Sequence, residues 1–287
     1  MATATASAQV ASAPMSRWTY LLGYLGAVIL AEILIAIPGS GPLDRPFQPI
    51  GLGVHILLVF TLMFASVLLQ TRDPVLANLL VAASLASLVR VFSLAVPRFP
   101  FVATPAENPY NTIPWLALVS IPLLVSVVAV SYVQGLRPRD LQLAIRTWKE
   151  ITPQIGIALT GIPLGVLEYA ILQPGPWIPA STAGAIAVAG LVIFLATGLS
   201  EELIFRGILL KRAVEGLGKQ PGLLYVTALF ASLHIFFLSP TDLVFVFGVG
   251  LLYGFVVLKT KNLWGAIMSH SLGNVMLYLV APFLWPK

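Results

Sequence analysis

Two adjacent glutamates and an arginine interrupt a stretch of the sequence that is apolar enough to cross a membrane. They are Glu201, Glu202 and Arg206, and two later apolar stretches each contain one histidine, His234 and His270. A charged side chain at the centre of a bilayer is energetically costly, so its retention there is a hypothesis of function by default. Carboxylates and imidazoles move protons near neutral pH, and we therefore expect chemistry inside a membrane.

The spacing of the charged residues predicts a division of labour between the two glutamates. Glu202 and Arg206 are four residues apart, so on a helix they share one face, with the acid before the base as an ion pair prefers. Glu201 points about 100° away from Glu202. We expect Glu202 and Arg206 to neutralise each other and Glu201 to face a cavity without an ionic partner. Such a carboxylate suits a general base, and its expected task is to activate water.

Each histidine has a candidate partner one helical turn away. Phe230 precedes His234 by four residues and is expected to stack on it, and Asn274 follows His270 by four. Buried imidazoles and amides need hydrogen-bond partners, which inside a membrane are each other or a substrate. His270 and Asn274 side by side are suitable donors to a developing oxyanion.

The composition requires a membrane to surround these residues. Of the 287 residues, 58% are hydrophobic and 9% are charged, and the mean hydropathy is +0.94. We predict an all-α fold, a polytopic bundle of about nine membrane helices with an embedded polar cavity. The absence of cysteine excludes Cys-ligated zinc, iron–sulfur centres and thiol catalysis. The spans are expected between turns rich in proline and glycine, such as those at 71–74 and 218–221. They lie near residues 18–37, 51–70, 75–96, 113–134, 152–171, 180–205, 222–238, 243–258 and 263–284.

Basic residues alternate between the predicted loops, and short loops rich in Lys and Arg stay in the cytoplasm. Three lie on the side opposite the N-terminus: Arg45, Arg98 and Lys287. Eleven lie on the side of the N-terminus: Arg17, Arg72, Arg137, Arg139, Arg146, Lys149, Lys211, Arg212, Lys219, Lys259 and Lys261. We predict a multi-pass protein of the bacterial cytoplasmic membrane with a cytoplasmic N-terminus. Glu201 is expected in the cytoplasmic third of the bilayer, in a site that opens to the cytoplasm.

The chain divides into three parts. Residues 1–16 are expected to form a disordered tail, residues 17–150 a four-helix membrane region with an interfacial linker, and residues 151–287 the core that carries the chemistry. The apolar and basic pattern around Leu141 and Trp148 predicts a short helix in the linker, lying in the membrane interface. No internal repeat is visible, which argues against a transporter that uses the acidic and imidazole groups as a proton relay.

Three motifs together resemble those of the CPBP intramembrane proteases. This family includes the type II CAAX prenyl endopeptidases and the bacteriocin-processing and immunity proteins called Abi. The residues from Glu201 to Arg206 fit Glu-Glu-x-x-x-Arg, those from Phe230 to His234 fit Phe-x-x-x-His, and those from His270 to Asn274 fit His-x-x-x-Asn. The motifs occur in the family's order, and the resemblance covers roughly residues 150–285.

The resemblance implies an endopeptidase that hydrolyses a peptide bond of a membrane-associated or lipidated substrate, as in CAAX or peptide-precursor processing. It implies that Glu201 and His234 position and activate the attacking water and that His270 and Asn274 stabilise the oxyanion. Supporting roles fall to Glu202, Arg206 and Phe230. The expected partners are membrane lipid and a peptide or lipidated protein, with no nucleic acid.

Three alternatives stay open at the level of sequence. The first is a zinc enzyme, which is the second choice after a metal-free mechanism. Glu201, His234 and His270 would be the zinc ligands, although no His-Glu-x-x-His motif is present. The chain could instead be a non-catalytic immunity or scaffold protein that binds a peptide partner. Taken alone, the glutamates could also mark a solvated helix end, and the histidines could be core residues bonded to neighbouring carbonyls. The remaining intramembrane polar residues are interpreted as packing pairs or snorkelling groups: Glu32, His55, Arg90 and Glu168.

Overall fold

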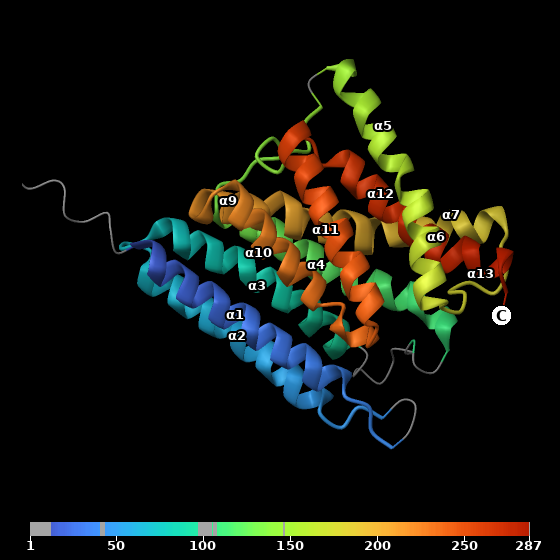
Figure 1. Cartoon of the computed structure of the whole chain (residues 1–287), viewed down its shortest axis with the longest axis horizontal. Coiled ribbons are helices and arrows are strands. Elements are labelled where there is room, and N and C mark those ends of the chain that lie inside the picture. The colour runs from blue at the N-terminus through green and yellow to red at the C-terminus, as the bar shows by residue number, and fades with distance from the viewer. Residues whose placement is uncertain (1–12, 41–43, 97–104, 106–107, 146, 287) are drawn as a thin grey trace, which may run out of the picture.

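The computed structural model describes residues 13–40, 44–96, 105, 108–145 and 147–286, and the side chains from residue 17 onward. All regular elements in these ranges are helical, and nine helical stretches are long and apolar enough to cross a membrane (Figure 1). The predicted all-α, polytopic fold is confirmed. The stretches are Arg17–Ala36, Gln48–Leu69, Pro74–Ala95, Pro109–Val133, Trp148–Leu172, Ala183–Leu217, Lys219–Phe237, Pro240–Thr260 and Trp264–Leu284.

The helices of the N-terminal half are α1 (Ala13–Ala36), α2 (Gln48–Leu69), α3 (Pro74–Ala95) and α4 (Thr112–Val133). Most of the predicted tail lies outside the described residues, and α1 begins at Ala13. Helix α1 packs on α2, α2 on α3, and α3 on α4. Asp73 caps α3 by accepting a hydrogen bond from the backbone nitrogen of Leu76, and Pro74 opens the helix. A capping carboxylate followed by proline is a strong helix start, and the predicted turn at 71–74 lies here.

The C-terminal half contains shorter elements joined end to end. They are α5 (Ile151–Leu159), α6 (Gly161–Leu172), α7 (Ala183–Ile193), η4 (Phe194–Leu199), α8 (Ser200–Glu202), η5 (Leu203–Leu209), α9 (Leu210–Leu217), α10 (Lys219–Ser232), η6 (Ile235–Phe237), α11 (Pro240–Thr260), α12 (Trp264–Val275), η7 (Met276–Val280) and α13 (Ala281–Leu284). From α7 to α9 the chain is one helical stretch of 35 residues. At 1.5 Å per residue it is about 50 Å long, more than the hydrocarbon thickness of a bilayer.

This sixth span ends later than the sequence predicted. The expected end was residue 205, but helical structure continues to Leu217 and stops at Gly218, which has φ +89°. The charged residues beyond 205 stay helical because they pair within the helix. Lys211 and Arg212 contact Glu215 at 3.2 and 2.7 Å.

The predicted helix in the linker between the two halves does not form. The described residues from 134 to 145 make turns, followed by a 3₁₀ turn at Trp148–Glu150. Their polar groups bond elsewhere: the Gln142 carbonyl accepts from the Leu263 nitrogen at 2.9 Å, and the Leu143 carbonyl accepts from Trp264 Nε1 at 2.8 Å. The linker is therefore fixed to the start of α12 rather than free to lie in the interface as a helix.

Helix α12 packs closely between two neighbours. It contacts α5 and α6 on one side and η4 on another. A Cβ atom at Gly165 would meet the backbone of Gly273, and one at Gly198 would meet Ser271. Small residues allow membrane helices to approach at backbone distance. This packing sets the position of α12 relative to the long sixth span.

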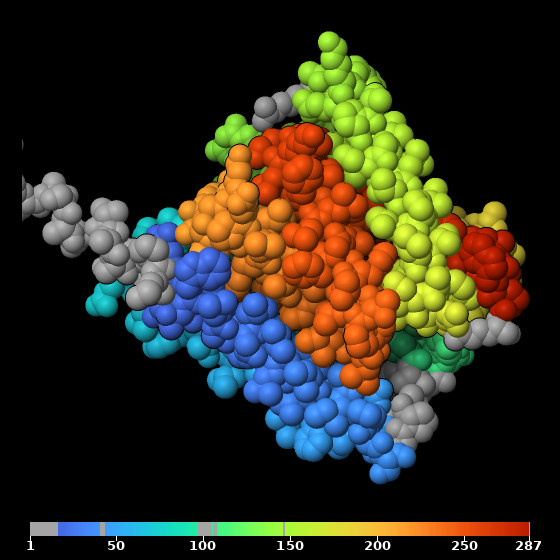
Figure 2. Space-filling model, viewed as in Figure 1, coloured from blue at the N-terminus to red at the C-terminus, as the bar shows by residue number. Residues whose placement is uncertain are grey.

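The surface is apolar where it would meet lipid. On α2 the side chains of Leu57, Phe60 and Phe64 are 64 to 69% exposed, and on α4 Val125 and Val128 are similarly exposed. In the space-filling view the surface of α11 lies between α1 and the α5–α6 pair (Figure 2). The buried core lies inside this shell, around η5 and α10.

Candidate active site

Both glutamates lie on a short α-helical segment between two π-helical segments. Segment α8 contains Ser200, Glu201 and Glu202, with η4 before it and η5 after it. π-Helical turns are rare and occur frequently at functional sites. Gly198 and Ser200 precede the glutamates and make close contacts: Gly198 packs on α12, and Ser200 donates to the Ala196 carbonyl.

Glu202 and Arg206 form the predicted ion pair. Arg206 Nη1 lies 2.8 Å from Glu202 Oε1, and the two side chains are 2% and 0% exposed. The guanidinium carbon also lies 4.3 Å from the centre of the Phe230 ring, in cation–π geometry. Full burial of both partners makes this a structural brace that holds the carboxylate in one place.

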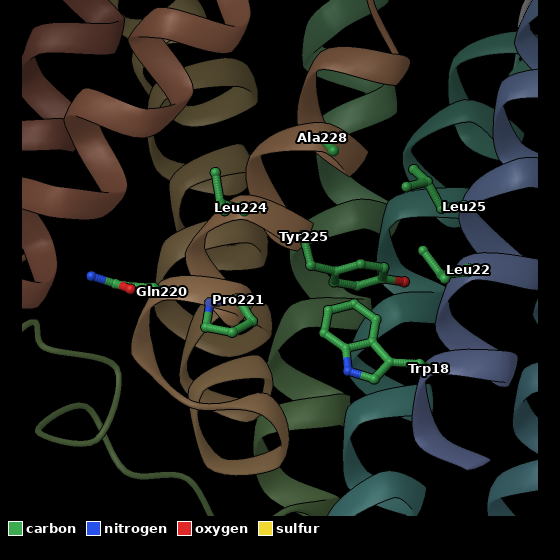
Figure 3. A pocket seen from close by; sticks show the side chains of 8 residues that line it. All are labelled: Trp18, Leu22, Leu25, Gln220, Pro221, Leu224, Tyr225 and Ala228. Carbon is green, nitrogen blue, oxygen red and sulfur yellow. The ribbon is translucent and has the colours of Figure 1, made fainter. Parts of the chain in front are cut away.

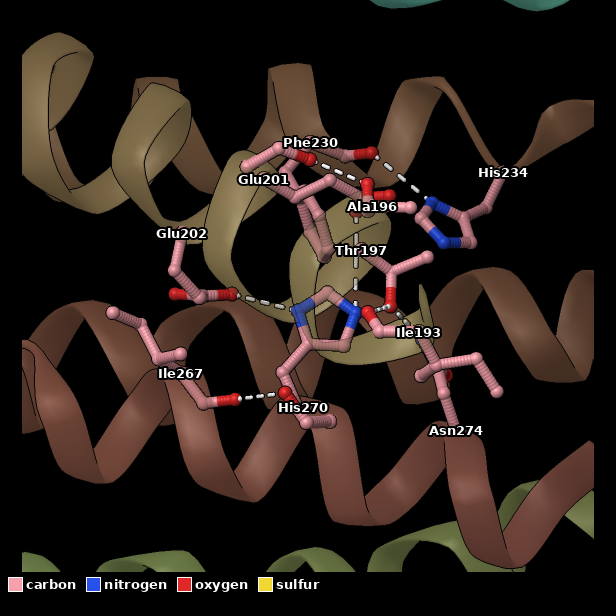
Figure 4. A network of polar contacts seen from close by, with 12 residues as sticks. Ile193, Ala196, Thr197, Glu201, Glu202, Phe230, His234, Ile267, His270 and Asn274 are labelled. Carbon is pink, nitrogen blue, oxygen red and sulfur yellow. Dashed lines mark hydrogen bonds and ion pairs between the residues drawn. The ribbon is translucent and has the colours of Figure 1, made fainter. Parts of the chain in front are cut away.

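The same carboxylate oxygen of Glu202 also holds His270, which the sequence did not predict. His270 Nδ1 lies 2.9 Å from Glu202 Oε1. On the other side of the ring, His270 Nε2 lies 3.9 Å from Glu201 Oε2, so the imidazole is set between the two adjacent glutamates (Figure 4). A carboxylate that accepts from Nδ1–H fixes the orientation of the ring, with Nε2 on the side of Glu201.

Glu201 is the more accessible of the two glutamates. Its side chain is 22% exposed, whereas that of Glu202 is fully buried. Its carboxylate was expected to lack an ionic partner, but it faces His270 across a gap longer than a hydrogen bond. That separation leaves hydrogen-bonding capacity on both groups.

His234 lies in the turn after α10 rather than on the helix itself. Its backbone nitrogen donates to the Ala231 carbonyl at 2.8 Å, and its ring Nδ1 lies 3.2 Å from the Phe230 carbonyl. Donation from Nδ1–H to this carbonyl leaves Nε2 as an acceptor. Phe230 contacts the ring with centroids 5.1 Å apart and planes at 54°, so the pair is tilted rather than stacked.

Phe230 connects the separate parts of the site. Its ring lies 6.3 Å from that of His270 in an edge-to-face arrangement and 5.0 Å from that of Phe205. Together with the contacts to His234 and Arg206, these place one aromatic ring against both imidazoles and the guanidinium. Aromatic pairs of this geometry add stability beyond the area they bury.

Asn274 is one turn from His270 on α12, but its side chain bonds to the sixth span. Its Nδ2 donates to Thr197 Oγ1 at 3.0 Å, and Thr197 donates to the Ile193 carbonyl at 2.8 Å (Figure 4). The amide nitrogen carries two hydrogens, and this bond uses one of them.

Sequence reasoning missed Thr197 and the residues behind His270. Thr197 precedes Glu201 by four residues, so a hydroxyl on the same helix face of an apolar span was the available indication. Ser269 Oγ lies 2.9 Å from both Tyr253 Oη and Thr160 Oγ1, and the Tyr253 ring lies 6.3 Å from that of His270. Nothing in the sequence pairs these three, since they come from α11, α12 and the α5–α6 junction.

A metal centre with protein ligands would need several side chains that converge on one point. Within the described ranges, no three His, Asp or Glu side chains converge on a point where they could hold a metal ion. Nδ1 of His270 contacts Glu202, and Nδ1 of His234 contacts the Phe230 carbonyl, so Nε2 is the nitrogen that each ring keeps for another partner.

Comparison with known proteins gives one family match. Residues 182–276 match a family model described as "Type II CAAX prenyl endopeptidase Rce1-like". The matched region runs from the start of α7 to the end of α12 and includes the three motifs. None of the curated proteins and none of the solved structures matches the chain.

Proposed function

Because this chain is a multi-pass member of the CAAX family of intramembrane proteases, we propose that it uses Glu201 to activate water against a peptide bond of a membrane-associated or lipidated substrate. The observation that carries the proposal is the placement of His270. Its imidazole bonds to the buried Glu202 on one side and faces the accessible Glu201 on the other. One carboxylate serves as a fixed support, which leaves the other for proton transfer.

The proposed chemistry begins with a water molecule held by Glu201 and the free Nε2 of His234. Glu201 accepts a proton from the water as the oxygen bonds to the carbonyl carbon of the scissile amide. The carbonyl oxygen becomes an oxyanion. When the tetrahedral intermediate collapses, the C–N bond breaks and the proton on Glu201 passes to the leaving amine. No other reactant is needed.

His270 and Asn274 are the proposed donors to the oxyanion. Glu202 accepts from Nδ1 of His270 and so stabilises its protonated form, in which Nε2 also carries a hydrogen. The second amide hydrogen of Asn274 approaches from the same helix, one turn further on. Preorganised donors of this kind supply a large part of catalysis in acyl transfer.

A metal-free mechanism is part of the proposal. It is supported by the finding that, among the described residues, no three His, Asp or Glu side chains converge where they could hold a metal ion. In this mechanism Glu201 alone transfers the proton from the water to the leaving amine.

Two apolar recesses support a substrate with a lipid anchor. One, of about 400 Å³, lies between α1 and α10, where Trp18 and Leu22 face Tyr225 (Figure 3). The second, of about 320 Å³, is lined by Ile235, the neighbour of His234, and by Leu243 and Phe247 of α11. Ala228 lines both. An isoprenoid or acyl chain in this region would bring its attached peptide toward His234.

The orientation in the membrane is proposed from the basic loops. Lys211 and Arg212 lie on α9 and Lys219 at the start of α10, and all three are expected on the cytoplasmic side, together with the N-terminus, in a bacterial cytoplasmic membrane. A substrate that carries a lipidated C-terminus in the cytoplasm would then meet the site from that side.

The test is cleavage of a fluorogenic peptide panel, with and without a farnesyl group, by protein reconstituted in liposomes. Glu201→Gln should lose activity, while the matched control Glu215→Gln, on the same helix but paired with Lys211 and Arg212, should keep it. A chelator should have no effect on the wild type. Survival of cleavage in Glu201→Gln would contradict the assigned base, loss with chelator alone would favour zinc, and no cleavage by the wild type would favour a peptide-binding role.

A further inference from the structure

A partly buried arginine of the N-terminal half is bonded to a buried glutamate on another helix. Arg90 of α3 donates to Glu32 of α1 through two nitrogens, Nε to Oε1 at 2.7 Å and Nη2 to Oε2 at 2.8 Å. Their side chains are 14% and 0% exposed, and His55 Nε2 of α2 lies 3.2 Å from Glu32 Oε1. The fork geometry of a guanidinium on a carboxylate fixes direction as well as distance. The three N-terminal helices thus meet at this cluster.

The same arginine reaches across to the C-terminal half. Arg90 Nη2 also donates to the backbone carbonyl of Leu233 at 2.6 Å, across 143 residues of sequence. Leu233 is the C-cap residue of α10, at the helix end where carbonyl groups lack partners within the helix. A cation is favoured at this end of a helix by the helix dipole.

This carbonyl belongs to the residue immediately before His234. On the other side of His234, the Arg90 guanidinium carbon lies 5.5 Å from the centre of the Phe236 ring. One side chain therefore contacts the turn on both sides of the histidine. Because His234 lies in a turn rather than within a helix, its place depends on contacts of this kind.

We propose that Arg90, oriented by Glu32, is a positioning residue for His234, which it acts on through the Leu233 carbonyl. The inference rests on the proposed function for the role of His234, and it gives the N-terminal helices a part in the reaction. Removal of Arg90 would leave the turn attached to α10 but free to shift. A displacement of 1 Å in a catalytic group costs on the order of 100-fold in rate.

The chain contains a matched control for this arrangement. Arg17 makes the same set of contacts elsewhere: Nε and Nη2 donate to Asp73 at 2.7 and 2.9 Å, and Nη1 donates to the Gly216 carbonyl at 2.9 Å. It too joins an N-terminal helix to the carbonyl end of a C-terminal one. Gly216 is about 20 Å along the helix from Glu201.

The experiment compares Arg90→Met with Arg17→Met in the full-length protein in liposomes, using the farnesylated fluorogenic peptide. We expect Arg90→Met to lower kcat by 10- to 100-fold with KM changed less than twofold, and Arg17→Met to leave both within twofold. Arg90→Lys should be intermediate, since one ammonium cannot hold Glu32 by a fork and the Leu233 carbonyl together. Equal losses in the two Met variants would overturn the proposal. If Arg90→Met does not fold, Arg90→Lys against Arg17→Lys decides by the same criterion.

A second measurement does not depend on any substrate. Diethyl pyrocarbonate modifies accessible imidazoles, and mass spectrometry follows His234 and His270 separately. We expect His234 to react several times faster in Arg90→Met than in Arg17→Met, with His270 unchanged. Equal His234 rates would overturn the positional role even if Glu201 proves to be the base, whereas a changed rate in a protein that cleaves nothing would uphold it while the proposed function fails.

Discussion

The Nδ1 atom of His270 lies 2.9 Å from Oε1 of Glu202. This contact joins α12 to the sixth span at the point where the two glutamates lie, and it gives two chemically identical neighbours different tasks. Glu202 is buried and committed to protein partners, while Glu201 remains accessible.

Glu202→Gln should lower both stability and activity. The amide keeps an acceptor for His270 but removes the charge that compensates Arg206, and breaking a buried ion pair costs about 3 kcal/mol. Thermal unfolding in detergent should show a lower Tm, and peptide cleavage should fall. The double variant Glu202→Gln/Arg206→Met should recover stability without recovering activity. An unchanged Tm in the single variant would contradict the ion pair between Glu202 and Arg206.

Thr197→Val should reduce kcat with little change in KM. Valine has the shape of threonine but leaves Asn274 without the oxygen that orients its amide, and we expect a loss on the order of 10-fold. Thr197→Ser retains the hydroxyl and should restore most of the rate. Asn274→Ala should cost more, on the order of 100-fold. Wild-type kinetics in Thr197→Val would contradict the role of Thr197 in orienting Asn274 toward the oxyanion.

Gly165→Ala should destabilise the contact between α6 and α12. The added Cβ would meet the backbone of Gly273, so the two helices must separate, at a cost of about 1–3 kcal/mol. Gly156→Ala on α5 is the control, because its Cβ would meet nothing, and replacing a helix glycine there should raise stability by about 0.5–1 kcal/mol. Chemical denaturation of both variants measures the difference. Equal stabilities would mean that α6 and α12 are less tightly packed.

Asp73→Asn should reduce stability at neutral pH but not in acid. Hydrogen bonds from Arg17 hold the pKa of Asp73 below its ordinary value. A carboxyl with a lowered folded pKa contributes stability above its unfolded pKa, about 3.9, and this contribution disappears as the pH falls through the folded pKa. Asparagine can still cap α3, so only the charge is tested. The Tm difference from the wild type should narrow below about pH 4, and a difference independent of pH would contradict the pairing with Arg17.

The membrane architecture could be predicted from sequence because each span is a local property. Apolar length and the turns at 71–74 and 218–221 define helices without knowledge of their neighbours, and Glu202 with Arg206 is an interaction within one turn. The charges after residue 205 misled the prediction of the sixth span, since Lys211 and Arg212 pair with Glu215 within the helix. The linker around Leu141 has a helical pattern but bonds to the start of α12 instead.

The contacts between spans could not be predicted in the same way. The sequence paired His270 with Asn274, four residues further along the same helix. In the structure His270 bonds to Glu202 and Asn274 bonds to Thr197. Those partners become available only because α12 approaches η4 at Gly198. Glu32, His55 and Arg90 were interpreted as packing pairs. The pairing is present, but the bond from Arg90 to Leu233 depends on how α3 meets the end of α10.

The π-helical segments on both sides of the glutamates have a consequence for alignment and for protein engineering. A π turn holds more residues than an α turn, so each segment behaves like a residue inserted into an otherwise regular helix. Deletion of one residue from η4 would rotate Glu201 and Glu202 about 100° relative to α7 while leaving their spacing to Arg206 intact. A sequence can therefore contain the whole Glu-Glu-x-x-x-Arg motif while its glutamates point in a different direction. Alignments of this helix should allow a gap of one residue beside the motif.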